Sequence, residues 1–138
     1  MKPTVLHTTG PREIAPLHRE ALAALGRDYT LEEVIERWSS VADTAFVVVS
    51  LDAPTGFISY RRTAPAGCYI SDLYIRPAYR GRGHARLLIG ALKARFRPVT
   101  LRVDPGNIGA VRLYVSEGFR QREGGDSAGR VGMTYEPN

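Results

Sequence analysis

Residues 75–88 read IRPAYRGRGHARLL, and this stretch decides how the rest of the chain is interpreted. The apolar residues before it predict a strand, its glycines predict a tight turn, and the apolar residues at its end predict a helix that begins directly at the turn. Free N–H groups at a helix N-terminus carry a partial positive charge, and glycines let a ligand approach the backbone closely. The stretch therefore predicts a binding site for an anion such as phosphate.

Two common phosphate-binding patterns do not fit this turn. A nucleotide P-loop needs a lysine directly after its last glycine, and none is near. The dinucleotide pattern Gly-x-Gly-x-x-Gly fails at its third glycine, where Arg86 stands. A third pattern, Arg/Gln-x-x-Gly-x-Gly/Ala, fits at every fixed position from Arg80 to Ala85.

A second motif follows at residues 107–119, which read NIGAVRLYVSEGF. Together the two motifs resemble those of the GNAT superfamily, the N-acetyltransferases that use acetyl-CoA. Residues 80–85 resemble the family's pyrophosphate loop, and residues 107–119 resemble its Asn-x-x-Ala-x-x-Leu-Tyr-x-x-x-Gly-Phe block. The two motifs lie in the family's order, about one strand apart, which makes the pair far more specific than a short glycine motif alone.

Hydrophobic periodicity outlines the elements around these motifs. Helical spacing and cap residues predict helices over residues 11–25, 30–38, 83–96 and 107–117. Apolar or alternating runs predict strands over residues 45–51, 57–62, 68–75, 99–103, 119–123 and 131–135. This order predicts a mixed α/β (α+β) domain. The resemblance implies a central sheet that is mostly antiparallel, has one splayed parallel strand pair, and is flanked by about four helices.

Length and composition exclude several classes of protein. The 138 residues, 43% of them hydrophobic and 24% charged, predict one globular domain over residues 1–138. No apolar run approaches the length of a membrane span, and the first residues lack the apolar core of a signal peptide. Cys68 is the single cysteine, which excludes an internal disulfide and a cysteine-based zinc site. We therefore expect a cytoplasmic protein.

The positive charge is confined to the second half of the chain. Residues 70–138 hold 12 basic and 6 acidic side chains, whereas residues 1–69 hold 7 and 8. Residues 76–102 contain eight basic residues and no acidic one. Such a block indicates nucleic acid, a membrane surface or a phosphate-bearing ligand as partner, although a solvated basic helix face would look the same.

The resemblance implies that CoA binds where two neighbouring parallel strands splay apart, here the strands that end at Ile75 and Val103. It implies that the backbone next to the first strand's end pairs with the pantetheine amides, that the loop amides hold the pyrophosphate, and that an asparagine touches the pantetheine arm. His84 occupies a variable position, and we expect it at the surface. The implied cofactor-binding residues are Leu73, Tyr74, Ile75, Arg80, Gly81, Arg82, Gly83, His84, Ala85, Arg86 and Asn107.

The resemblance further implies direct acyl transfer to an amine through a tetrahedral intermediate, with Tyr114 as the acid that protonates the leaving thiolate. An amine of pKa about 10.4 is only roughly 0.1% neutral near neutral pH, so a general base would help. Asp72 is our first candidate for that base because its strand is expected to line the cleft. The alternatives are a carboxylate that bonds at a strand irregularity and, for Tyr114, an ordinary core aromatic.

Other residue types suggest no further chemistry. The three histidines are scattered and predict no metal site, and His7 and His18 have no partner evident in the sequence. Cys68 has no nearby histidine, so we do not expect a thiol nucleophile. Trp38 falls at helical spacing, which is typical of a core residue, although in the family this region often forms one side of the acceptor site.

The acceptor stays open at this point. Ribosomal-protein N-alpha-acetyltransferases often carry a glutamate base where this chain has Arg102, which argues against a protein N-terminus. Small amines and aminoacyl-tRNA are further candidates, and the oligomeric state, including a homodimer, is undetermined. We expect acetyl-CoA and an amine as partners, and neither a metal, a membrane nor a nucleic acid. The alternative is a non-catalytic CoA-binding sensor or a small basic RNA-binding module.

Overall fold

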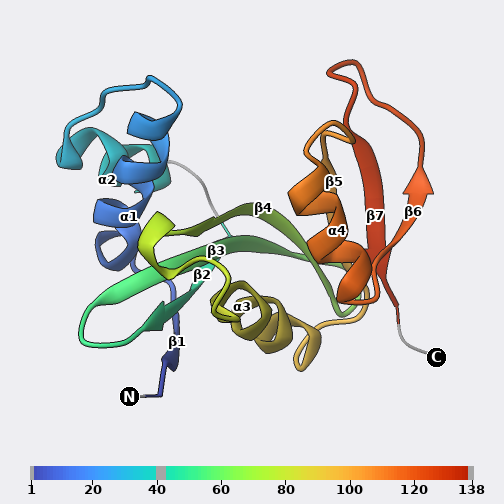
Figure 1. Ribbon diagram of the computed structural model, residues 1–138, viewed down its shortest axis with the longest axis horizontal. Helices are drawn as coiled ribbons and strands as arrows, with labels where there is room; N and C mark the ends of the chain where they lie inside the picture. Colours follow the sequence, from blue (N-terminus) through green and yellow to red (C-terminus); the bar gives the residue numbers. More distant parts are fainter. Residues whose placement is uncertain (1, 40–42, 137–138) are drawn as a thin grey trace.

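The computed structural model describes residues 2–39 and 43–136. Over these residues the chain forms a seven-stranded sheet in the order β1-β2-β3-β4-β5-β7-β6, flanked by four α-helices (Figure 1). The strands are β1 (Thr4–Thr8), β2 (Thr44–Ser50), β3 (Pro54–Thr63), β4 (Gly67–Ile75), β5 (Val99–Val103), β6 (Arg120–Glu123) and β7 (Val131–Tyr135). The helices are α1 (Pro11–Ala24), α2 (Leu31–Ser39), α3 (His84–Lys93) and α4 (Ile108–Ser116), with a short 3-10 helix η1 (Pro77–Tyr79) before α3.

The sheet is antiparallel except between β4 and β5. These two strands pair in parallel at Cys68 with Val99 and at Tyr69 with Thr100, and no further pair follows. Toward their carboxyl ends the two strands diverge, which separates the β1–β4 part of the sheet from the β5–β7 part (Figure 1). The predicted mixed sheet with one splayed parallel pair is therefore confirmed.

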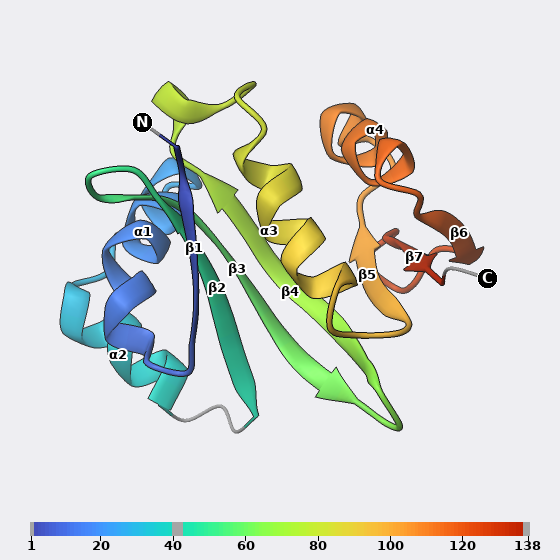
Figure 2. The same cartoon turned by 90° about the horizontal axis from the view of Figure 1, so that it is seen from below.

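The helices cover opposite faces of the sheet. Helices α1 and α2 lie on one face, and α3 lies on the other, where it crosses β3 and β4 (Figure 2). Helix α3 buries Leu88, Ile89 and Leu92 in the larger core cluster, which also holds Tyr114 of α4. Burial of such side chains contributes about 1.5–3 kcal/mol each, which holds α3 firmly against the strands. A smaller cluster under α1 contains Phe57 of β3.

A β-bulge in β4 sets which side chains reach which face. Ser59 of β3 pairs with Asp72 and the next residue pairs with Ile70, so Ser71 is the extra residue. Ser59 and Phe57 are two apart and share a face, which is the α1 face because Phe57 packs there. Asp72, opposite Ser59, therefore lies on the α1 face, and its neighbour Leu73 packs against the α3-side cluster. For Asp72, the sequence analysis gave a carboxylate that bonds at a strand irregularity as the alternative to a catalytic base, and this bulge is such an irregularity.

The predicted elements are all present, with small differences at their ends. Strand β3 starts at Pro54 and not at residue 57, and α3 ends at Lys93 and not at residue 96. Strand β1 was not predicted, because its five residues are mostly exposed and lie at the sheet edge, where no apolar alternation is required. None of the described helices is long and apolar enough to cross a membrane.

Candidate functional site

A cleft of about 900 Å³ opens on the α3 side of the sheet, between the end of β4 and the first residues of α3 and α4. It lies where β4 has lost its pairing with β5. Its lining residues are Leu73, Tyr74, Ile75, Tyr79, Arg80, Gly81, Gly83, His84, Ala85, Arg86, Asn107, Gly109, Ala110 and Leu113. All the residues implied to bind cofactor except Arg82 are in this set, so the fold brings the two sequence motifs together.

The glycine turn, residues 80–86, has a backbone that only glycine adopts easily. Gly81 and Gly83 have φ values of 76° and 84°. A Cβ at either position would meet nothing within 4 Å, so internal packing does not require glycine there. Gly83 is the N-cap of α3 and provides no side-chain cap, which leaves the first N–H groups of the helix available. The turn thus combines open space with the positive end of a helix, as an anion site requires.

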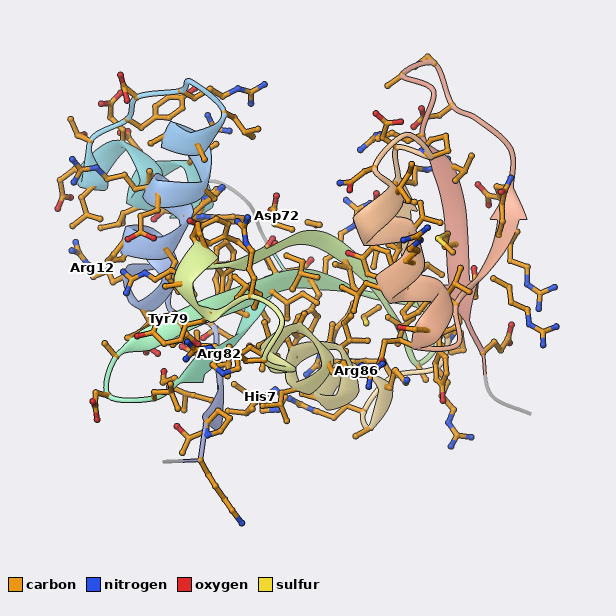
Figure 3. The ribbon with its side chains drawn as sticks, in the orientation of Figure 1. His7, Arg12, Asp72, Tyr79, Arg82 and Arg86 are labelled. Atoms are coloured by element: carbon orange, nitrogen blue, oxygen red, sulfur yellow. The ribbon has the colours of Figure 1, made fainter. Side chains whose placement is uncertain are left out.

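Arg80 fixes the turn to the end of β4. Its Nε donates a hydrogen bond to the carbonyl oxygen of Ile75 at 2.9 Å, and its guanidinium lies 5.8 Å from the centre of the Tyr74 ring. This contact explains why the motif begins with a long side chain that carries N–H donors. Arg82, two residues on, lies over the ring of Tyr79 at 5.4 Å, at the rim of the cleft. Figure 3 shows Tyr79, Arg82 and Arg86 around the start of α3.

His84 is buried, so the prediction that it lies at the surface is wrong. Only 4% of the residue is exposed, and its Nδ1 lies 2.7 Å from Oγ1 of Thr55. The Thr55 hydroxyl also lies 3.2 Å from the carbonyl oxygen of Val49. The ring also stacks on Tyr79, with centroids 5.9 Å apart. The first residue of α3 therefore anchors the helix to the β2–β3 hairpin.

The opposite side of the cleft is set by α4. Asn107 caps this helix, because its Oδ1 accepts the Ala110 N–H at 3.2 Å. Arg86 of α3 pairs with Glu117 beyond the end of α4 at 3.2 Å, and Lys93 donates to the Glu117 carbonyl oxygen at 2.8 Å. These contacts tie α3 to the end of α4 and so fix the separation of the two helices at one end of the cleft.

Tyr114 lies behind the cleft lining, in the core between α4 and the strands. It is 7% exposed, and its ring packs edge-on against Phe119 with centroids 5.5 Å apart. Burial and, to a smaller extent, the negative charge of Asp72 raise the pKa of Tyr114 to about 12. The phenol is therefore protonated throughout the neutral range, and Asp72 is near enough to act on it.

Asp72 lies on the sheet face opposite the glycine turn. Its Oδ2 accepts a hydrogen bond from the buried Ser59 hydroxyl at 2.9 Å. In Figure 3 its side chain is in the opening between α1 and α4, whereas Arg82 and Arg86 are beside α3. The carboxylate is therefore separated from the glycine turn and lies beside the divergence of β4 and β5.

His18 of α1 and Trp38 of α2 form a contact that the sequence did not reveal. The Trp38 Nε1–H donates to Nδ1 of His18 at 2.8 Å, and the two rings lie 5.0 Å apart. The residues are 20 positions apart and belong to different helices, so no local pattern could have paired them. The helical spacing of Trp38 favoured core packing, and the sequence showed no partner for His18.

The remaining predictions concern residues away from the cleft. Arg102 pairs with Glu123 at 2.6 Å and with Asp126 at 4.0 Å, so its charge is balanced by the β6–β7 region. Cys68 is buried, and burial raises the pKa of its thiol to about 12, which does not suit a nucleophile. In the described part of the chain, no group of three His, Cys, Asp or Glu side chains could hold a metal ion.

Comparisons with known proteins agree with this architecture. The model of the Acetyltransferase (GNAT) family matches residues 12–119. An acetyltransferase from Thermus thermophilus is 22% identical with a TM-score of 0.75, covering 95% of this chain and 96% of that one. NAA60 of Arabidopsis thaliana, in complex with a bisubstrate analogue, is 19% identical with a TM-score of 0.68, covering 96% and 97%. A GNAT-family acetyltransferase from Staphylococcus aureus is 12% identical with a TM-score of 0.68, covering 97% and 98%.

At sequence identities of 22% or less, the structural similarity shows that this chain shares its fold with these three proteins. No curated protein matches the chain by sequence.

Proposed function

Since the chain belongs to the acetyltransferase (GNAT) family, we propose that it transfers the acetyl group of acetyl-CoA to a primary amine of a small molecule, peptide or protein. The family makes the protein an acyltransferase. The observation that carries the finer proposal is the cleft at the divergence of β4 and β5, with the glycine turn at its rim. We further propose that it works in the cytoplasm, because a single unpaired cysteine suits a reducing compartment.

The lining of the cleft fits the chemistry of CoA. The open space over Gly81 and Gly83 and the free N–H groups of α3 suit a pyrophosphate. Residues 73–75 have no strand partner on β5, so the backbone groups on that edge are open to the pantetheine amides, apart from the Ile75 carbonyl oxygen, which accepts from Arg80. Asn107 borders the same cleft from α4. The volume of about 900 Å³ lies within the usual range of small-molecule and cofactor sites.

Acetyl-CoA supplies a thioester whose carbonyl carbon an amine can attack. In the proposed reaction the amine nitrogen forms a bond to that carbon, the carbon–sulfur bond breaks, and the proton lost by nitrogen ends on sulfur or in solvent. Because the cleft occupies the α3 face, the amine reaches the divergence of the strands from the α1 face. The acceptor thus meets the side chains that α1, β3 and β4 present there.

Tyr114 is the proposed proton donor to the leaving sulfur. With a pKa of about 12 its phenol keeps its proton at neutral pH, whereas a free thiol has a pKa near 8.5. The phenol therefore acts first as a hydrogen-bond donor, and the proton moves only as negative charge develops on sulfur. The edge-on contact with Phe119 fixes the ring in the core.

Asp72 is the proposed base for the incoming amine. Its carboxylate faces the side from which the amine arrives, and the Ser59 hydroxyl holds one of its oxygens at 2.9 Å. The other oxygen is left to attract an ammonium group and to accept the proton that it loses, directly or through water.

The proposal is tested by measuring thermal stabilisation by acetyl-CoA and release of CoA thiol with a panel of amines and N-terminal peptides. We expect stabilisation by acetyl-CoA and thiol release with one class of acceptor. Stabilisation without release from any acceptor would support the CoA-binding sensor. No stabilisation would contradict the cofactor site, and binding of RNA that weakens steeply with salt would then favour the RNA-binding module.

A further inference from the structure

The contact between Trp38 and His18 determines where the histidine carries its proton. An indole N–H can only donate a hydrogen bond, so Nδ1 of His18 must be the acceptor in the 2.8 Å contact. An uncharged imidazole with an unprotonated Nδ1 carries its proton on Nε2. His18 is therefore the Nε2–H tautomer, and protonation of Nδ1 would break the bond from Trp38.

The surroundings of His18 favour this uncharged form. The residue is 8% exposed, and its ring meets the edge of Phe57 with centroids 5.7 Å apart. Burial lowers the pKa of His18, the charge of Arg37 lowers it further, and the charge of Asp72 acts in the opposite direction. The imidazole is thus held by aromatic rings on two sides and remains neutral at neutral pH.

The proton on Nε2 is available to a ligand. In the described part of the chain, Nε2 of His18 has no hydrogen-bond partner, whereas Nδ1 is satisfied by Trp38. Every fully buried side-chain nitrogen or oxygen of the described residues has a partner, so Nε2 is not fully enclosed, and the residue as a whole is 8% exposed. The two nitrogens lie at different edges of the ring, and Nε2 therefore faces away from Trp38.

The position of His18 relates this donor to Asp72. The ring of His18 meets Phe57 of β3, and Ser59 is the next residue of β3 on the same face. Ser59 in turn pairs with Asp72 and donates a hydrogen bond to its carboxylate. The charge of Asp72 acts on the imidazole of His18, yet no ion pair joins the two among the described residues, so they are neighbours without a direct bond.

We propose that His18 is a fixed, uncharged hydrogen-bond donor of the acceptor site, and that with Asp72 it selects amines that carry an accepting oxygen close to the amino group. The Asp72 carboxylate would bind the ammonium group of the amine, and the Nε2–H of His18 would donate a hydrogen bond to the oxygen of a carbonyl or hydroxyl. Amino-acid amides and peptide N-termini have this arrangement, whereas plain alkylamines do not. This inference rests on the proposed amine acetylation.

The uncharged state of His18 is essential to this role. An imidazolium beside Asp72 would repel the ammonium group of the acceptor and would compete with it for the carboxylate. By occupying Nδ1, Trp38 removes the site at which the ring would gain its charge. Trp38 is thus a positioning residue that fixes the tautomer and the orientation of the donor.

The first test compares glycinamide with isobutylamine, which has the same heavy-atom skeleton with methyl groups in place of the carbonyl oxygen and the amide nitrogen. We expect His18→Phe to lower kcat/KM about tenfold more for glycinamide than for isobutylamine, as loss of one hydrogen bond of about 1.4 kcal/mol would do. His18→Gln can donate from a similar position, and it should restore much of the preference. The KM for acetyl-CoA should change little in either variant.

His7→Phe is the matched control, because His7 lies on β1 and its Nδ1 contacts Arg95, away from Asp72. It should leave the ratio of the two rates unchanged. Equal losses for both amines in His18→Phe would overturn the inference while the proposed function stands. Absence of thiol release by the wild-type protein with any amine would instead overturn the proposed function, and the inference with it.

The second test does not depend on turnover. Nitrogen-15 NMR of the imidazoles should show His18 as the Nε2–H tautomer, and His18 should gain its second proton at a lower pH than an exposed histidine. Trp38→Phe removes the indole donor, so His18 should then populate both tautomers and gain a proton at higher pH than in the wild type. An Nδ1–H tautomer in the wild type, or an unchanged titration in Trp38→Phe, would overturn the inference.

Discussion

Tyr114 combines a protected position with a protonated phenol. Tyr114→Phe keeps the ring against Phe119 and removes only the hydroxyl, so the fold and the affinity for CoA should be retained. We expect kcat to fall by about 100-fold, the lower end of what a positioned acid contributes. The ratio of wild-type to variant rates should stay constant from about pH 7 to about pH 10, because the pKa of Tyr114 is about 12. An unchanged kcat would remove Tyr114 from the mechanism.

Asp72 is tested through the pH dependence of the rate. Asp72→Asn removes the base, so the variant depends on the small neutral fraction of the amine itself. We expect a loss of about 100-fold near neutral pH that shrinks as the pH rises toward the amine pKa of about 10. Ser59→Ala is the matched control, since it removes only the 2.9 Å hydrogen bond to the carboxylate. It should cost less and keep the wild-type shape of the pH profile, whereas an identical profile for Asp72→Asn would point to another base.

Histidines mark the limit of what the sequence can predict at the scale of single residues. The resemblance identified His84 as a loop position and gave no sign that its ring would be buried against Thr55. The partner of His18 lies 20 residues away on another helix. Side-chain hydrogen bonds between elements depend on how the elements pack, and a single sequence without a fold does not contain that information.

At the scale of elements, the glycine turn is the most sensitive segment. Gly83 has a φ of 84°, which a residue with a side chain adopts at a cost of roughly 1–2 kcal/mol. Gly83→Asp would add that strain and place a carboxylate at the open N-terminus of α3, where the cofactor phosphates would bind. We expect at least a 100-fold loss of CoA affinity by calorimetry, with a circular dichroism spectrum like that of the wild type. Normal CoA binding by this variant would contradict the assignment of the turn.

The junction of β3 and β4 provides a second test at this scale. A Cβ on Gly56 would lie 2.7 Å from the carbonyl oxygen of Tyr74, so Gly56→Ala must push the end of β4 outward. We expect a loss of about 1–3 kcal/mol in the free energy of unfolding, and weaker CoA binding because residues 73–75 move. Gly90→Ala is the control. Gly90 lies in α3, and beyond the helix's own backbone a Cβ there would have no atom within 4 Å, so this variant should stabilise the protein by about 0.5–1 kcal/mol. Denaturant titrations measure both effects.

The motifs allowed most elements to be predicted, because glycine turns and apolar periodicity are local signals. They predicted α3, α4 and the strands around them to within a few residues. Strand β1 lacks such a signal, since it is held by its backbone pairing with β2 over Thr4–Thr8. The bulge at Ser71, which helps to direct Asp72, also has no local signature. Both features are determined by the pairing of strands that are distant in sequence.

At the scale of the whole molecule, two buried acids link folding to alkaline pH. Burial raises the pKa of Tyr114 from 10.0 to about 12 and that of Cys68 from 9.0 to about 12. Each raised pKa stabilises the folded protein at pH values below the pKa of the same group in the unfolded chain. That contribution to the free energy of unfolding is lost as the pH rises through the pKa of the group in the folded protein. The change for Tyr114 corresponds to roughly 3 kcal/mol.

We therefore expect the urea midpoint to fall steeply between about pH 9 and about pH 12, the window in which these two groups ionise. Tyr114→Phe removes one of them and should make the decline shallower, with little change below about pH 9. Parallel curves for the wild type and the variant would show that Tyr114 does not couple folding to pH.

The short contact between β4 and β5 has a mechanical consequence for the molecule. Among the described residues, strand pairing joins the two parts of the sheet only at Cys68 with Val99 and Tyr69 with Thr100, so the seam resembles a hinge between two arms. The shared core and the contacts of Arg86 and Lys93 with Glu117 also connect these arms. One arm carries α3 and the glycine turn, and the other carries α4 and Tyr114. A ligand that contacts both arms adds a further point of attachment, besides the contacts between α3 and Glu117. Binding of such a ligand would thus restrict changes in the angle between the two parts of the sheet.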